Sequence, residues 1–297
     1  MPVQLNPYPQ VACIVLNWNG WQDTIECLDA LQECTYSRLT VVVVDNGSTN
    51  DSLARIRAAH PDTLLLESHE NLGFAGGNNI GIRYALGNGA EYLWLLNNDT
   101  KPSPDALSAL VAKAMTDEGI GAVASICYYA DAPSIVEAWA GARPNLWIGY
   151  SRNSTVPRRD DWFRSLNGAS LLIARTALED AGLLDDGFFL YWEDTEFCLR
   201  LRKKGWRIAA APDSRVIHKV NASTGGNKLI LDRYHTASGL RILHLHSPVP
   251  RLASLLFLTM RFARRLLQLQ FARCRSVWAG VRDHYDQGRR STKPTNT

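Results

Sequence analysis

The first 130 residues alternate between short apolar runs and longer segments with apolar residues at helical spacing. The short runs are rich in Val, Ile and Leu, which is typical of strands buried on both faces of a sheet. Strands alternating with helices predict an α/β fold with a Rossmann-like, mainly parallel central sheet and helices on both faces. Strands are expected at residues 11–18, 39–44, 63–66, 92–96 and 121–128, and helices at 21–34, 73–86 and 104–115. A capping box at Ser48–Asp51 is expected to open a further helix that runs to about Ala59.

Composition sets the class of protein without naming a function. The chain has 297 residues, 46% hydrophobic and 21% charged, so it can bury one large core and carry an appendage. Its six cysteines form no CxxC pair, which predicts buried thiols rather than a zinc site or disulfides. The first residues do not resemble a signal peptide, so we expect a cytoplasmic location.

Charge divides the chain near residue 227. Residues 228–297 carry 13 Lys/Arg against 3 Asp/Glu, whereas residues 1–227 are net acidic. This asymmetry predicts one domain at 1–227, a basic amphipathic helical extension at 228–287 and a disordered tail at 288–297. The two parts are expected to meet different partners.

The extension has two interpretations, both compatible with its sequence. Its uninterrupted apolar run, Leu255–Leu258, is far shorter than the roughly 20 residues that span a bilayer. The extension is expected either to lie peripherally on the anionic inner face of a cytoplasmic membrane, or to pack on the first domain or on a second subunit of a homodimer. Nucleic acid is not an expected partner, because the basic positions lack interleaved aromatic platforms.

Polar clusters follow three of the expected strands, at Asn17–Asn19, Asp45–Gly47 and Asn97–Asp99. The carboxyl ends of parallel strands meet at one edge of the sheet, where open α/β folds bind ligands. Asp99 can offer oxygen ligands to Mg²⁺ or Mn²⁺ while a diphosphate fills other positions, and a turn or N-cap Asp is the alternative. Asp45 can accept the imide N–H of uracil or thymine, or can be a turn residue. Neither GxGxxG after the first strand nor a Walker motif occurs, so a nucleotide would be held in another way.

Six motifs follow one another along the chain, at Val11–Gly20, Val42–Thr49, Glu70–Asn78, Leu95–Asp99, Leu166–Ala169 and Tyr191–Arg200, followed by Lys204–Trp206 and His218. Together they resemble the motifs of family 2 glycosyltransferases, which have the GT-A fold. The resemblance covers about residues 10–225 and implies a nucleotide-sugar half at about 10–130 and an acceptor half at about 131–227. The variant Asn97-Asn-Asp99 with Asn71–Asn78 is most similar to bacterial rhamnosyltransferases of O-antigen and other cell-surface glycans. It implies inverting transfer from dTDP-β-L-rhamnose to a sugar hydroxyl, with UDP- or GDP-sugars as alternative donors.

The resemblance also implies roles on the donor side. Asp45 matches the pyrimidine contact, and Asp99 matches the main protein carboxylate on Mg²⁺ or Mn²⁺. Asn97 replaces the first carboxylate of the family's DxD pattern, which leaves strict metal dependence open. His218 either completes the metal site, touches the diphosphate or is structural. The other residues expected around the nucleotide and diphosphate are Asn17, Asn71, Gly73, Asn78 and Asn98. Lys219 and Thr224–Gly226 are candidates to close over the phosphates. Alternatively, the glycines pack a helix closely on the sheet, and Lys219 is a solvated surface charge.

On the acceptor side, Asp194 is the candidate general base, because an inverting displacement needs a group that removes the proton from the attacking hydroxyl. Glu193 is its rival and is expected to orient the acceptor; an N-cap role is the alternative for Asp194. Trp192 is expected to stack on a sugar face, and Asn167 and Gly168 to contact a saccharide acceptor, free or linked to polyprenyl diphosphate.

Two functions from other classes compete with this interpretation. A sugar-phosphate nucleotidylyltransferase would carry a basic Gly-rich loop near its N-terminus, which Asn17–Gly20 is not. A non-catalytic glycan-binding scaffold is suggested by Asn97, although the chain keeps Asp99, Glu193, Asp194 and His218.

Overall fold

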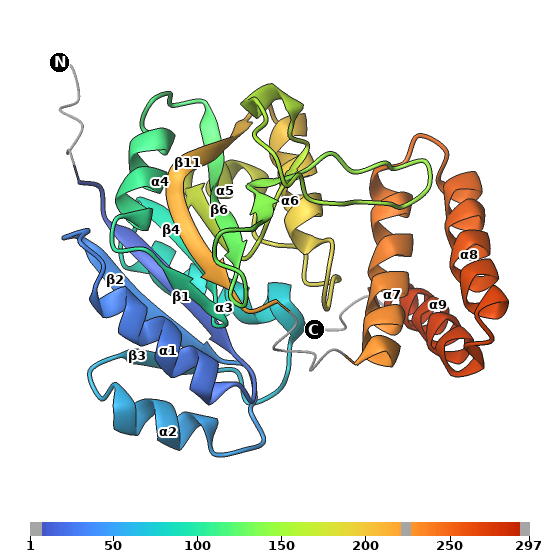
Figure 1. The fold of residues 1–297 in the computed structure, drawn as a ribbon, viewed down its shortest axis with the longest axis horizontal. Coiled ribbons are helices and arrows are strands. Elements are labelled where there is room, and N and C mark those ends of the chain that lie inside the picture. Colours follow the sequence, from blue (N-terminus) through green and yellow to red (C-terminus); the bar gives the residue numbers. More distant parts are fainter. Residues whose placement is uncertain (1–7, 221–226, 292–297) are drawn as a thin grey trace, which may run out of the picture.

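A computed structural model describes residues 8–220 and 227–291 of the chain. In this part of the protein, a curled central sheet has helices on both faces and a helical extension at one end (Figure 1). The strands are β1 (Val11–Asn17), β2 (Leu39–Asp45), β3 (Leu64–Glu67), β4 (Tyr92–Asn97), β5 (Thr100–Pro102), β6 (Ile120–Tyr129), β7 (Val136–Trp139), β8 (Gly141–Ala142), β9 (Ser165–Leu166), β10 (Ser170–Ala174) and β11 (Arg207–His218). The helices are α1 (Trp21–Gln32), α2 (Ser52–Ala59), α3 (Gly73–Gly87), α4 (Ala106–Ala114), the 3-10 turn η1 (Asp160–Trp162), α5 (Arg175–Ala181), α6 (Glu193–Lys203), α7 (Lys228–His246), α8 (Pro250–Leu267) and α9 (Phe271–Ser291).

The strand order of the central sheet is β3-β2-β1-β4-β10-β6-β11-β5, with β7 on β6. Strands β1, β2, β3 and β4 are mutually parallel, and β6 and β11 are parallel to each other. The sheet is mixed because β10 runs antiparallel between β4 and β6, and β5 and β7 are antiparallel to their neighbours. The predicted α/β fold with helices on both faces is confirmed, with a mixed central sheet that is parallel from β3 to β4, and the ends of β1, β2 and β4 meet at one edge.

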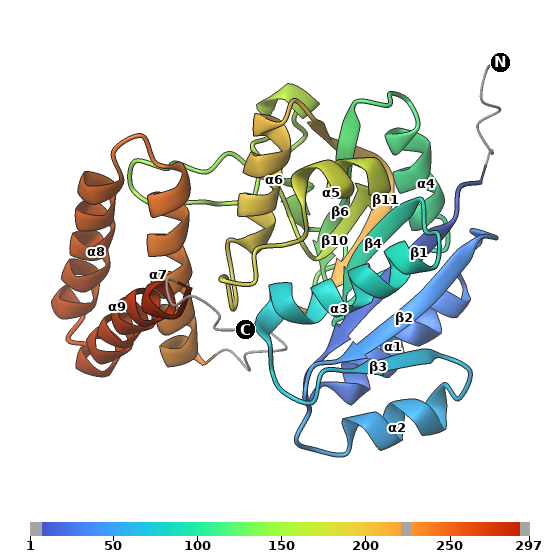
Figure 2. The same ribbon diagram turned by 180° about the vertical axis from the view of Figure 1, so that it is seen from behind.

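Each central strand divides its side chains between two cores, as expected for a sheet that is covered on both faces. In β1, Ile14 faces a core with helices α3, α5 and α6, whereas Val15 faces a core with α1, α2 and α4. Figures 1 and 2, which view opposite sides, show these two helical layers. The sheet edge between the layers is therefore fixed from both sides.

Several predicted boundaries were wrong by one to three residues. The third strand is Leu64–Glu67, and the helix expected at 104–115 is Ala106–Ala114. The predicted capping box is also absent: Asp51 is the N-cap of α2 without a side-chain cap bond, and the Ser48 hydroxyl donates to Asp45. The Asp45 carboxylate therefore accepts the hydroxyl that was expected to cap the helix.

The extension is built from α7, α8 and α9. Helix α7 lies between the sheet domain and α8, as both views show. A third core joins Leu240, Leu243 and Phe257 of the extension to Phe188 and Trp192 of the first domain. None of the helices among the described residues has the length and apolar character needed to cross a membrane. Of the predicted disordered tail at 288–297, α9 includes the backbone up to Ser291, and residues 292–297 lie outside the described part.

Candidate functional site

A cavity of about 630 Å³ opens at the sheet edge where β4 ends, within the usual size range of small-ligand sites. Residues from the two predicted halves face each other across it, and α7 contributes to its wall. The cavity is lined by ten of the predicted site residues: Asn71, Gly73, Asn97, Asn98, Asp99, Asn167, Gly168, Glu193, Asp194 and His218. The structure therefore brings together motifs that are up to 147 residues apart in sequence, from Asn71 to His218.

Asn17 and Asp45 form a buried polar network beneath the cavity rather than part of its lining. The Asn17 amide donates to Asp45 Oδ1 at 2.7 Å, and the Ser48 hydroxyl and amide donate to the same carboxylate at 2.6 and 3.0 Å. Asn17 Oδ1 accepts from the Thr24 hydroxyl at 2.9 Å. These bonds hold the Asp45 carboxylate at the edge of the sheet and occupy three of its roughly four acceptor positions.

Gly73 lies where the chain passes close to the acceptor-side loop. Its φ is +73°, and a Cβ at this position would lie 2.3 Å from the carbonyl oxygen of Phe189. Phe74 N donates to that oxygen at 2.7 Å, and Asn71 Oδ1 accepts from Gly73 N at 2.9 Å. Only glycine fits this approach, so Gly73 joins the two halves of the cavity.

Asn78, predicted to contact the nucleotide, has a different environment. It is buried inside α3, where its amide donates to the carbonyl of Phe74 at 2.9 Å, and it does not line the cavity. The start of this run of glycines and asparagines lines the cavity, whereas its later part belongs to a helix that packs closely on the sheet. At Gly81, for example, a Cβ would lie 2.6 Å from the Ile14 side chain. The expectation for Asn78 is corrected accordingly, because its side chain is turned into the protein.

Asp99 and His218 lie side by side, with Asp99 Oδ1 3.4 Å from His218 Nε2. The other ring nitrogen, Nδ1, is 3.3 Å from Glu137 Oε2, a partner that sequence patterns did not suggest. Burial lowers the pKa of His218, but the carboxylates of Asp99 and Glu137 more than offset this and raise it to about 9. In the absence of other ligands the imidazole is a cation between two carboxylates.

Divalent-metal binding can be tested against the free oxygens of this cluster. Asp99 Oδ1 and the nearby Asn97 Oδ1 are buried and receive no hydrogen bond from the described residues. Such hard oxygens suit Mg²⁺ or Mn²⁺. No group of three or more His, Cys, Asp and Glu side chains within 8–220 and 227–291 is arranged to hold a metal ion. The residues fit a metal that takes its remaining ligands from a bound diphosphate.

Glu193 and Asp194 occupy the first turn of α6 on the opposite wall. Asp194 Oδ2 accepts from Gly168 N at 3.0 Å, and its other oxygen accepts from Thr195 N. Glu193 Oε2 is buried without a hydrogen-bond partner in the described structure. Burial, then repulsion from Asp194, raises the pKa of Glu193 to about 8. Burial also raises the pKa of Asp194, but its backbone donors oppose that rise. Asp194 is thus better suited to carry the negative charge at neutral pH.

The loop that presents this pair is strained. Tyr191 and Trp192 have φ values of 68° and 73°. Residues other than Gly, Asn and Asp rarely adopt this left-handed backbone conformation. Trp192 is the N-cap of α6, so the alternative that Asp194 is an N-cap residue does not hold. The left-handed turn directs the chain into α6 with Glu193 and Asp194 facing the cavity.

Helix α7 holds this loop in place. The Tyr191 ring stacks on His235 with centroids 3.8 Å apart, and Phe189 stacks on Tyr234 at 4.7 Å. The Ser238 hydroxyl donates to the carbonyl of Leu190 at 2.8 Å. Arg241 forms a bidentate pair with Asp185 at the start of the loop, with contacts of 2.8–3.1 Å. The strained conformation is therefore supported from the extension and not from the sheet domain alone.

Trp192 does not have the predicted sugar-stacking position. Its side chain is only 9% exposed and belongs to the core shared with α7 and α8. The aromatic side chains that line the cavity are instead Trp18, Phe74, Phe189, Tyr191 and Tyr234. The sequence showed that residues 188–192 are rich in aromatic side chains, but it did not predict the left-handed turn that buries Trp192.

Ile230 and Tyr234 of α7 also line the cavity, so the predicted boundary at residue 227 does not separate the site from the extension. Apolar spacing in α7 gave no signal of this contact. Lys219 pairs with Asp23 and Glu26 at 2.6 and 2.9 Å, which agrees with its interpretation as a paired surface charge. Thr224–Gly226 lie outside the described residues.

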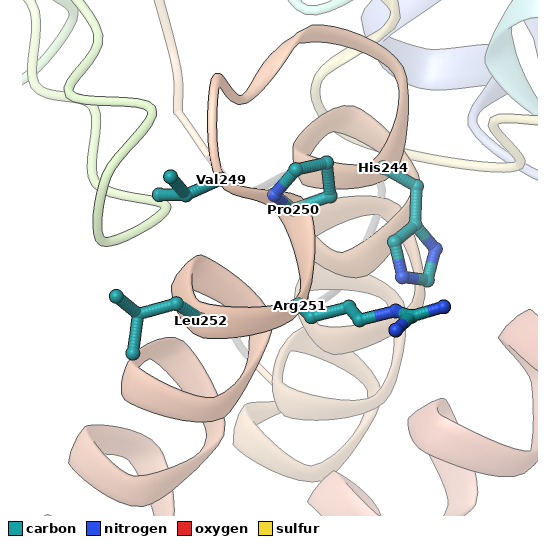
Figure 3. Close-up of a pocket in the computed structure, with 5 residues that line it drawn as sticks. All are labelled: His244, Val249, Pro250, Arg251 and Leu252. Carbon is teal, nitrogen blue, oxygen red and sulfur yellow. The ribbon is translucent and has the colours of Figure 1, made fainter.

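A second hollow, of about 510 Å³, lies at the turn between α7 and α8. Figure 3 shows Arg251 beside His244, with Val249, Pro250 and Leu252 completing its wall. Its lining contains no carboxylate, so it offers no acidic side-chain oxygen to a metal ion.

Solved structures define the fold class. The mannosyltransferase PcManGT from Pyrobaculum calidifontis, solved with GDP-Man and Mn²⁺, matches with a TM-score of 0.57 over 96% of this chain and 90% of its own, at 19% identity. GalNAc-T7, solved with UDP, GalNAc and Mn²⁺, matches with a TM-score of 0.65 over 91% of this chain and 54% of its own, at 14% identity. The sheet domain has the GT-A fold of glycosyltransferases.

Sequence comparison narrows this class to a family. Residues 12–163 match Glycosyl transferase family 2, and residues 92–282 match Glycosyl transferase family group 2. The chain therefore belongs to glycosyltransferase family 2, as its motifs predicted. The second match extends over most of the basic extension, in agreement with the contacts of α7.

Three curated relatives indicate the range of activities among similar proteins. The N-acetylglucosaminyl-diphospho-decaprenol L-rhamnosyltransferase of Mycobacterium tuberculosis is 25% identical over 245 residues, covering 74% of this chain and 80% of the relative. The dTDP-rhamnosyl transferase RfbF of Shigella flexneri is 26% identical over 246 residues, covering 81% and 76%. A hexosyltransferase, Agl10 of Haloferax volcanii, is 25% identical over 224 residues, covering 73% and 69%.

Proposed function

We propose that this glycosyltransferase moves L-rhamnose from dTDP-β-L-rhamnose, with inversion, to a hydroxyl of a saccharide acceptor linked to polyprenyl diphosphate. The observation that carries the proposal is the cavity in which Asp99 and Asp194, from opposite walls, face a common space. The donor and the lipid-linked acceptor are suggested by the names of the mycobacterial and Shigella relatives. The product would serve the synthesis of O-antigen or another cell-surface glycan.

The donor would bind along the ends of β1, β2 and β4. The remaining acceptor position on the Asp45 carboxylate can take the imide N–H of thymine, while Asn71 and the backbone at Gly73 face the diphosphate. Asp99, with His218, would hold Mg²⁺ or Mn²⁺, which supplies positive charge to the departing diphosphate. The amide of Asn97 adds a neutral oxygen, so the protein contributes little negative charge to this site.

Asp194 would act as the base. Its position in the first turn of α6 and its bond from Gly168 N favour the carboxylate form, which can accept the proton of the acceptor hydroxyl as that oxygen attacks the anomeric carbon. Glu193, held neutral by burial at pH 7, can orient the same acceptor by donating a hydrogen bond. Asn167 and Gly168 flank this position and complete the acceptor side.

The test is nucleotide release from dTDP-, UDP- and GDP-sugars, with and without Mg²⁺ or Mn²⁺, using a lipid-linked saccharide acceptor. Asp194→Asn should lower kcat by about 10²–10⁴-fold with the Kd of the nucleotide unchanged. Asp99→Asn should weaken nucleotide binding and its metal dependence. Asp51→Asn, an exposed carboxylate at the start of α2, is the matched control and should leave both unchanged.

The panel also separates the alternatives. Release from dTDP-rhamnose alone supports the donor assignment, whereas release from a GDP- or UDP-sugar keeps the mechanism and changes the donor. An Asp194→Asn variant as active as the wild type refutes the assignment of the base. Binding of no nucleotide sugar would favour a glycan-binding scaffold.

A further inference from the structure

Helix α8 is apolar on the face directed away from the rest of the protein. Its inner face, with Ala253, Phe257 and Arg265 at four- and eight-residue spacing, is buried. Its outer face consists largely of leucines and a methionine that no other described element covers. These side chains are Leu252, Leu255, Leu256, Met260, Leu266 and Leu267, and they are 40–86% exposed.

Helix α9 carries a second exposed stripe, in which aromatic rings alternate with arginines. Phe271, Trp278 and Tyr285 are 55–59% exposed, and Arg275 and Arg282 lie between them. The steps of four, three, four and three residues place all five on one side of the helix. Neither arginine forms an ion pair with another described residue, whereas Arg233, on α7, pairs with Asp283. Aromatic rings with arginines are typical of helices lying at a membrane interface.

The charge of this region is one-sided. Between Asp232 and Asp283 the sequence contains nine arginines and neither Asp nor Glu. Five of these arginines pair with Asp185, Asp232 or Asp283, whereas Arg251, Arg264, Arg275 and Arg282 form no ion pair with a described residue. A symmetric dimer formed through this surface would bring the unpaired arginines of two copies together, and these outnumber the exposed carboxylate of Asp286 on α9. Anionic lipid headgroups supply the missing negative charge, and their acyl chains can accept the leucines.

We propose that the outer faces of α8 and α9 form a peripheral docking surface for an anionic lipid bilayer. The hollow at the α7–α8 turn has the same combination, with Arg251 and His244 beside Val249, Pro250 and Leu252 (Figure 3). Because Ile230 and Tyr234 of α7 line the cavity, docking would bring the catalytic site close to the membrane. The choice of this partner rests on the proposed function, since a polyprenyl-linked acceptor resides in the same bilayer.

Vesicle sedimentation of the full chain tests the proposal directly. The wild type should bind vesicles of phosphatidylcholine with phosphatidylglycerol, bind pure phosphatidylcholine much more weakly, and dissociate as salt is raised. The double variant Leu255→Glu/Leu267→Glu should bind at least about tenfold more weakly. Arg275→Gln/Arg282→Gln should lose about fivefold for each arginine.

Matched controls alter the same residue types elsewhere. Arg83→Gln, an exposed arginine on α3, and Val156→Glu, 48% exposed in a loop, should bind vesicles like the wild type. Nucleotide release with a soluble saccharide acceptor should be unchanged in all four variants. A wild-type protein that releases no nucleotide in this assay would refute the proposed function, and vesicle binding would still be an independent result.

Two outcomes would overturn the docking surface. One is a wild-type protein that does not sediment with anionic vesicles at about 0.1 M salt, where surface charges still act over roughly 10 Å. The other is a dimer, seen by light scattering, that Leu255→Glu/Leu267→Glu converts to a monomer without any change in vesicle binding. That result would make the face an interface between copies of this chain.

Discussion

Removing the His235 ring should impair catalysis without impairing donor binding, because this ring supports the strained turn that presents Glu193 and Asp194. Two consecutive left-handed residues, Tyr191 and Trp192, cost on the order of 1–3 kcal/mol each. The ring stack on His235 is worth about 0.5–1.5 kcal/mol beyond its burial. The two residues together cost about 2–6 kcal/mol, more than this stack alone supplies, so the turn depends on several supporting contacts. Losing one of them should therefore lower the population of the competent loop.

The perturbation is His235→Ala, and His235→Phe is the control that keeps an aromatic ring against Tyr191. A loss of about 1 kcal/mol of support predicts a kcat lowered about fivefold in His235→Ala, since 1.4 kcal/mol corresponds to tenfold. The KM for the nucleotide sugar should change less than about twofold, because Asn71 and Asp99 lie on the other wall. His235→Phe should keep most of kcat.

The assay is steady-state nucleotide release at saturating and limiting donor, with the unfolding temperature measured alongside. A lowered kcat with an unchanged pH profile identifies a positioning effect. Full activity of His235→Ala would refute the claim that α7 supports the turn. An equal loss in His235→Phe would show that the imidazole itself, and not the stacked ring, is needed.

Two further predictions concern stability. Asp232 is buried against Arg261, Arg265 and Arg273. Asp232→Asn should therefore lower the free energy of unfolding, measured by denaturant melts, by about 3–5 kcal/mol. A change of less than about 1 kcal/mol would show that these arginines find other partners. The folded pKa of Glu193, about 8, lies above its usual value, so its contribution to the free energy of unfolding is fully present below about pH 4.5 and is lost as pH rises from there through 8. Glu193→Gln should therefore be more stable than the wild type at pH 8, by on the order of 2–4 kcal/mol, and equally stable at pH 4.5; parallel stability curves for the two proteins would contradict the assignment.

The control for the first of these is Asp283→Asn, which removes a carboxylate paired with Arg233 in a half-exposed position. Surface pairs contribute little, so its unfolding free energy should fall by less than about 1 kcal/mol. A loss as large as that of Asp232→Asn would show that the extension depends on its total charge rather than on the buried carboxylate.

For the first 130 residues, the sequence by itself determined all the strands except β5, the four helices α1 to α4 and the position of Asp99 at a strand end. Each of these follows from local pattern: a run of apolar residues such as Tyr92–Leu96 can be satisfied only in a buried strand, and the polar residues after it must lie at the sheet edge. Ordered motifs also placed the chain in its family. The predicted start of α2 failed because a neighbouring side chain competed: Asp45, three residues before Ser48, accepts the hydroxyl that was expected to cap the helix.

Only the tertiary structure decided which side chains reach the cavity. Asn78 and Trp192 were predicted site residues that packing turned inward, whereas Glu137 and Tyr234 reached the site without any local signal. The physical reason is that a side chain's direction depends on backbone conformation and on contacts between segments far apart in sequence. Local periodicity specifies which face of a helix or strand is buried. Which segment packs against that face is decided only when the chain has folded.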